Sequence, residues 1–189
     1  SWHRSYHRTM TQEANASTVR GDFDDVLVEG KNRRFRLSRR DGRFYFQEVG
    51  PNGGVSRPVQ ILMVTGSHHY QVYWFSNSAD RKVQVFPFVY LFADERWVPR
   101  GSELLNPPTP HLARTEWNTA CLVCHSTRPI PSADDGAMDT QVAEFGIACE
   151  ACHGPAEDHV AQMRDPAARF ASYFRSEDSA AIVDPSRLD

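Results

Sequence analysis

Residues 34–46 read RFRLSRRDGRFYF, and this run carries the clearest structural pattern in the chain. Polar and apolar side chains alternate on both sides of Asp41-Gly42, which is the period of a half-buried strand. A two-residue Asp-Gly loop suits the type I′ turn between antiparallel strands, because both central residues of that turn need a positive φ. The run therefore predicts a β-hairpin.

Further strand patterns lie on both sides of this hairpin. Alternation starts near Val26, and Asn52-Gly53 predicts a second turn. Short apolar or aromatic runs follow, each bounded by turn-forming residues. These runs are Val59 to Val64, Tyr70 to Phe75 and Val83 to Phe92. Residues 21–100 therefore predict a β-rich region with the topology of a small meander.

The two ends of the chain predict helices. Trp2, Tyr6 and Met10 are four residues apart, so residues 1–20 are expected to hold an N-terminal helix. Residues 101–189 begin with a proline-rich linker and continue with short helical candidates, one of them over Asp139 to Cys149. The predicted class is α+β: a small β-meander packed beside a helix-and-loop segment.

The composition excludes several classes of protein. The chain has 189 residues, and no apolar run approaches the length that spans a bilayer. Its formal net charge is -3, whereas general nucleic-acid binders usually have a basic excess. We therefore expect no transmembrane segment and no nucleic-acid partner.

All four cysteines fall in two copies of one motif. Residues 121–125 read CLVCH and residues 149–153 read CEACH. In a C-x-x-C-H segment the two sulfurs add to the vinyl groups of one haem, and the histidine binds its iron. The sequence predicts two covalent haems, with Cys121, Cys124, Cys149 and Cys152 as attachment sites and with His125 and His153 as iron ligands.

A structural zinc site is the chief alternative, because two C-x-x-C pairs also occur in zinc ribbons. Their separation lies slightly outside the usual ribbon spacing. A four-cysteine zinc site also leaves both histidines without a role. The zinc-binding interaction module is therefore kept only as the weaker interpretation.

Each haem iron has a second axial position, and other histidines are candidates for it. His68 and His69 follow Gly66-Ser67 and open an aromatic strand whose rings suit the wall of a porphyrin. One of the two is the predicted distal ligand of the haem at His125. His111, just before Cys121, is a substitute for them.

Several segments resemble multihaem c-type cytochromes related to the nitrifiers' tetrahaem cytochrome c. The most specific is GIACEACHGPAEDHV at residues 146–160, which looks like a C-x-x-C-H-G-P…H-V haem segment. The opening WHRSYH resembles a W-x-x-S-x-H helix, and Trp117-Asn118 and Ser126-Thr127 also match that group. The chain is most like its long relatives, which are often fused to helical repeats.

The resemblance implies two further ligands. His7 matches the distal histidine of the C-x-x-C-H-G-P haem, so it is expected to pair with His153. His159 matches a histidine that serves an upstream haem, so its iron is expected outside this chain. The haem motifs that normally flank these segments are absent, which leads us to expect a portion of a longer cytochrome.

These expectations favour electron transfer over catalysis. The alternative within the haem interpretation is an enzyme that reduces or oxidises a small nitrogen or oxygen species at an open iron. Redox proteins or other haem subunits are the expected partners, and association into an oligomer stays open. By resemblance to c-type cytochromes, we expect a periplasmic or extracellular location.

Overall fold

The structure is a computed structural model, and it describes residues 2–76, 79–102, 116–134, 136–174 and 182–185. The proline cluster at residues 106–110 and the substitute ligand His111 lie outside these ranges.

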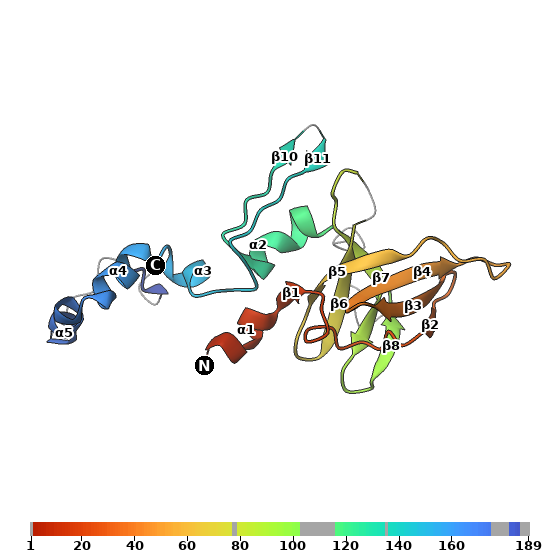
Figure 1. The fold of residues 1–189 in the computed structure, drawn as a ribbon, viewed down its shortest axis with the longest axis horizontal. Coiled ribbons are helices and arrows are strands. Elements are labelled where there is room, and N and C mark those ends of the chain that lie inside the picture. The colour runs from red at the N-terminus through yellow and green to blue at the C-terminus, as the bar shows by residue number, and fades with distance from the viewer. Residues whose placement is uncertain (1, 77–78, 103–115, 135, 175–181, 186–189) are drawn as a thin grey trace.

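One antiparallel sheet of eight strands forms the body of the molecule (Figure 1). Its order is β2-β3-β4-β5-β6-β7-β8, and β1 pairs with β5. The strands are β1 Thr11–Glu13, β2 Val26–Glu29, β3 Arg34–Arg40, β4 Arg43–Val49, β5 Val59–Thr65, β6 Tyr70–Phe75, β7 Gln84–Leu91 and β8 Arg96–Pro99.

The predicted hairpin is confirmed. β3 and β4 pair from Arg34–Val49 to Arg40–Arg43, and the loop between them is Asp41-Gly42. The φ angles of these two residues are 49° and 73°, as a type I′ turn requires. The strands predicted near residues 59, 70 and 83 are also present as β5, β6 and β7.

The sheet curls around an aromatic core, which we call the inner core. Phe35 on β3 packs against Phe86 on β7, with ring centroids 5.2 Å apart, and Phe46 on β4 packs against Phe75 on β6 at 4.9 Å. Contacts between strands so far apart in the sheet mean that it closes on itself as a near-barrel. The inner core consists of Phe23, Val28, Phe35, Leu37, Phe44, Phe46, Ile61, Val64, Tyr73, Phe75, Phe86, Phe88 and Tyr90.

The opposite face of the sheet is also partly buried. Met63 and Trp74 pack with Trp117 and Leu122 in a second cluster, here called the outer cluster. A register shift between Ile61 and Met63 accompanies the change of face on β5, since Ile61 belongs to the inner core. One sheet thus buries side chains on both faces.

The predicted α+β class, with a small meander beside a helix-and-loop segment, is wrong. The fold is mostly β, and the eight-stranded near-barrel dominates it. Alternation identifies individual strands but does not show that they curl around one core. β1 and β8 are short and owe their pairing to β5 and β7, so their own residues give little signal.

The helices are short. Near the N-terminus they are a 3₁₀ turn at Trp2–Arg4 and α1 at Tyr6–Thr9, after which Thr11 enters β1. The helix predicted over Asp139 to Cys149 is absent, and β12 at Glu144–Phe145 pairs there with β9 at Ser126–Thr127. A second ribbon joins β10 at Ala133–Asp134 to β11 at Ala137–Met138.

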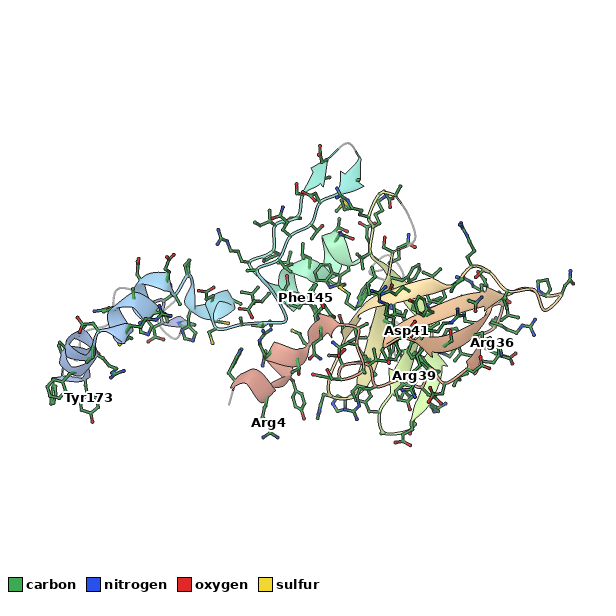
Figure 2. All side chains as sticks on the ribbon, viewed as in Figure 1. Arg4, Arg36, Arg39, Asp41, Phe145 and Tyr173 are labelled. Carbon is green, nitrogen blue, oxygen red and sulfur yellow. The ribbon has the colours of Figure 1, made fainter. Side chains whose placement is uncertain are left out.

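The C-terminal described helices extend away from the sheet (Figure 1). They are α3 at Glu150–His153, α4 at Glu157–Arg164 and α5 at Pro166–Phe174, and Figure 2 shows Tyr173 at the far end of this arm. None of the helices in the described part of the chain has both the length and the apolar character needed to cross a bilayer.

Candidate haem-binding site

Both cysteine motifs adopt the same local structure. α2 spans Leu122–His125 and α3 spans Glu150–His153, so in each motif the first cysteine caps a four-residue helix that ends at the histidine. Residues three apart lie on one side of a helix, and the two sulfurs of each motif therefore lie on a common side. None of the four cysteines forms a disulfide. This arrangement suits attachment of both sulfurs to a single ring.

The first motif is fixed to the sheet by the segment before it. The backbone N–H of Trp117 donates to the Val83 carbonyl at 2.8 Å, and the Val83 N–H donates to Asn118 Oδ1 at 2.7 Å. Leu122 is fully buried in the outer cluster, where it packs with Trp74. The position of α2 is therefore set by contacts with β5, β6 and the start of β7.

A cavity of about 460 Å³ lies beside this motif. Cys121 and His125 of this motif line it together with His68 and His69. A volume of this size falls within the usual range for sites that bind small molecules or cofactors. The lining residues are Tyr6, His7, Met10, Thr65, Gly66, Ser67, His68, His69, Tyr70, Val72, Trp74, Val89, Arg100, Cys121 and His125.

The histidine pair sits in the turn between β5 and β6. The ring centroids of His68 and His69 are 4.0 Å apart, and the Tyr6 ring packs against His68 at 4.2 Å with the two planes tilted by 41°. Gly66 has a φ of 101°, and an added Cβ there would collide with the Tyr70 carbonyl oxygen. The glycine therefore permits the tight turn that brings both imidazoles to the cavity.

Some of the aromatic rings in and near the cavity are exposed. Tyr6 and Tyr70 line the cavity and are 56% and 40% exposed. Trp2 is not part of the lining, but it is 39% exposed and its ring stacks at 5.7 Å on that of His7, which does line the cavity. Exposed aromatic surface of this kind marks a place where another apolar body binds. A porphyrin, which is flat and mostly apolar, fits such walls.

His7 and His125 both line the cavity, although the resemblance pairs His7 with His153. Its own carbonyl accepts a hydrogen bond of 3.0 Å from the N–H of Ile147, two residues before Cys149. His7 thus lies between the two motifs. Its partner among the two haem-binding histidines stays a prediction.

The N-terminal helix is clamped to the segment before the second motif. Arg8 forms an ion pair of 2.6 Å with Glu144 and also donates to the Phe145 carbonyl. The Arg8 carbonyl lies so close to Gly146 that an added Cβ would collide with it. Figure 2 shows Phe145 in the region between α1 and α2. We call these contacts the N-terminal clamp.

The second motif shows a feature typical of histidine ligands to metals. Nδ1 of His153 is 2.9 Å from the carbonyl oxygen of Val183, and the Val183 N–H donates to the His153 carbonyl at 2.9 Å. A carbonyl oxygen only accepts, so Nδ1 carries the proton and Nε2 keeps its lone pair. Histidines that bind metals usually make this type of second hydrogen bond, which fits His153 to an axial role.

His159 is not among the residues that line the cavity. It is half-buried on α4, in the arm that leaves the sheet. Its expected role toward a haem outside the chain is not tested by this arrangement. Within the described ranges, no group of three or more His, Cys, Asp or Glu side chains gathers in a geometry that would hold a metal ion. The two cysteine pairs are therefore not assembled into the four-sulfur site that the zinc interpretation needs.

Sequence reasoning did not assign Tyr6 or Arg100 to the site. Both line the cavity, yet they are more than 90 residues apart; Tyr6 occupies an unspecified position of the W-x-x-S-x-H segment, and Arg100 belongs to no motif. Only the pairing of the strands brings them together. The aromatic strand 70–75, in contrast, could be recognised from its own residues.

Comparisons with known proteins give one match, which is a structural one. No family model matches the chain, and no curated protein matches it. The chain is similar to the crystal structure of an outer cell wall cytochrome, OcwA, with a TM-score of 0.51 and 17% sequence identity. The match covers 98% of this chain but only 36% of that one. At this identity the comparison shows a shared fold, and the relation to the nitrifiers' cytochromes stays a prediction.

The clamp is testable by adding one methyl group. Gly146→Ala forces a Cβ against the Arg8 backbone, and overpacking of this kind costs about 1–3 kcal/mol beyond the cost of the positive φ. We expect faster hydrogen exchange at the Ile147 amide, because its bond to the His7 carbonyl is lost.

Gly136→Ala is the matched control. Gly136 has a similar φ of 79°, but an added Cβ there would meet nothing within 4 Å. Equal exchange at Ile147 in the two variants would show that the N-terminal clamp does not hold this segment.

Proposed function

We propose that the chain is an electron-transfer part of a multihaem c-type cytochrome that carries two covalent haems. One is attached at Cys121 and Cys124 with His125 as ligand, and the other at Cys149 and Cys152 with His153 as ligand. The single observation that carries the proposal is the cavity, where Cys121 and His125 share one site with His68 and His69. The similarity of the fold to part of an outer cell wall cytochrome supports it.

Each group of residues in the two motifs has a separate proposed role. When bound, haem supplies an iron that exchanges single electrons between its ferric and ferrous states. The cysteines would hold the ring covalently, and His125 and His153 would each bind one iron. The carbonyl of Val183 holds His153 in the tautomer that leaves Nε2 free to bind. The outer cluster excludes water from the side of the site that faces the sheet.

In this proposal His68 or His69 would be the second protein ligand to the iron near His125. Both line the cavity, and an iron held by two histidines would leave no position for a substrate. This favours an electron carrier over the haem-enzyme alternative. His7 is proposed as the distal ligand toward His153, and His159 is proposed to serve a haem of another subunit or of a longer chain.

The proposed location and partners follow from the same chemistry. Covalent haem of this type places c-type cytochromes outside the cytoplasm, so the chain is proposed to be periplasmic or extracellular. Its partners are then redox proteins or other haem subunits. The α3–α5 arm, which ends in the exposed rings of Phe170, Tyr173 and Phe174, offers apolar surface for such contacts.

Electrochemistry tests the function directly. We expect two reversible one-electron couples in the holoprotein, one of which disappears in a Cys121→Ala, Cys124→Ala variant and the other in a Cys149→Ala, Cys152→Ala variant. Val123→Ala is the control, because this side chain stands between the first two cysteines and is 65% exposed. Two couples in every variant, or none in the wild type, would contradict the proposal.

Carbon monoxide tests the distal side of the haem at His125. A tethered imidazole competes with an external ligand at high effective concentration, so the reduced wild type should bind carbon monoxide slowly or not at all. The His68→Ala, His69→Ala double variant should bind it at one haem, as seen in a difference spectrum. Tyr70→Ala opens the same wall without removing an imidazole and should behave like the wild type. Rapid stoichiometric binding to the wild type would instead favour the enzyme.

A further inference from the structure

The chain between the two cysteine motifs doubles back on itself. Residues 126–134 and 136–148 are the described part of this connection. β9 pairs with β12 at its base, Ile130 pairs with Gln141 further along, and β10 pairs with β11 beyond that bridge. We call this part of the chain the inter-motif ribbon, and Figure 1 shows its two limbs side by side. The ribbon therefore brings the chain back to the first motif just before the second motif begins.

The base of the ribbon is bonded to the first motif. The hydroxyl of Ser126 donates to the Leu122 carbonyl of α2 at 2.6 Å, and the Gly146 N–H donates to the His125 carbonyl at 3.1 Å. Ser126 is buried, so its hydrogen bond is shielded from competition by water. One end of α2 is thus held by both limbs of the ribbon.

Thr127 extends this bonding to the second motif. Its hydroxyl donates to the Gly146 carbonyl at 2.9 Å and accepts from the Ala148 N–H at 2.7 Å. A hydroxyl has one proton and can accept at its lone pairs, so a single threonine makes both bonds. Ala148 directly precedes Cys149, which caps α3. The threonine side chain therefore links the segment after His125 to the residue before Cys149.

The hydroxyl of Thr127 does more than complete the strand ladder. The ladder itself uses backbone groups, such as the Ala143 N–H that donates to the Thr127 carbonyl at 3.1 Å. Thr127 is 1% exposed, a setting in which valine would fit by shape. Valine would leave a buried carbonyl and a buried N–H without their partner, and such groups are costly to bury alone. The bonds to Gly146 and Ala148 therefore depend on the hydroxyl.

The relative position of the two motifs matters for the proposed chemistry. Electron transfer between two cofactors slows steeply as the gap between them widens, and the protein contributes by fixing where each cofactor is held. We propose that Thr127 is a positioning residue that holds the two haem-binding motifs at one separation, so that electrons pass directly between the two haems. This inference rests on the proposed function. Thr127 acts through the backbone of Gly146 and Ala148.

The test compares Thr127→Val, which removes the hydroxyl, with Thr127→Ser, which keeps it. Pulsed electron paramagnetic resonance on the oxidised holoprotein measures the distribution of iron–iron distances, and exchange spectroscopy on the half-reduced protein measures electron exchange between the haems. We expect Thr127→Val to broaden the distance distribution and to slow the exchange several-fold. Thr127→Ser should stay close to the wild type.

Thr11→Val is the matched control. Thr11 is also 1% exposed, and its hydroxyl bonds to that of Thr65 on β5 at 3.2 Å, away from both cysteine motifs. Its loss should lower stability without changing the iron–iron distances. Hydrogen exchange of the wild type gives a second measurement that needs no variant: the amides of Gly146 and Ala148 should be as protected as those of the sheet.

The outcomes separate this inference from the proposed function. A wild-type mass without haem overturns both. Two haems by mass with an unchanged distance distribution in Thr127→Val, or equal broadening in Thr11→Val, overturn the role of Thr127 alone. If Thr127→Val does not fold, the wild-type exchange decides: rapid exchange at Gly146 and Ala148 overturns the inference, and protection equal to that of the sheet, together with wild-type distances in Thr127→Ser, supports it.

Discussion

The packing of Trp117 and Leu122 on Met63 and Trp74 is the contact on which the rest of the site depends. It joins the first cysteine motif to the outer face of the sheet. The hydrogen bonds from Trp117 to Val83 and from Val83 to Asn118 hold the same segment in place. Without it, His125 would have no fixed relation to the β5–β6 turn. The cavity between them exists because a sheet with an aromatic inner core also buries part of its outer face.

Because the sheet buries side chains on both faces, only part of the fold could be predicted from the sequence. Alternation around Asp41-Gly42 identifies the hairpin, and the apolar runs identify β5, β6 and β7. Alternation does not show that the sheet curls, because closure depends on contacts such as Phe35 with Phe86 between distant strands. The N-terminal helix is shorter than its four-residue spacing predicts, since Thr11 is buried and pairs with Thr65 on β5.

The residues of the candidate site also fall into those that the sequence identifies and those that it does not. The cysteine motifs and the His68-His69 pair are local patterns, so they could be recognised from the residues alone. Arg100 and Tyr6 could not, because only tertiary pairing brings them to the cavity. The position of His7 is intermediate: its motif is recognisable, but the N-terminal clamp through Arg8 and Glu144 that places it between the two cysteine motifs is a tertiary contact.

The central claim is that both C-x-x-C-H motifs carry covalent haem. The most direct measurement is the intact mass of the denatured holoprotein, produced in a host that attaches haem to cysteine. Thioether bonds survive denaturation, whereas bound zinc does not. The account predicts the polypeptide mass of 21.4 kDa plus two haem groups. An unmodified polypeptide mass, from a preparation that binds zinc when folded, would contradict it.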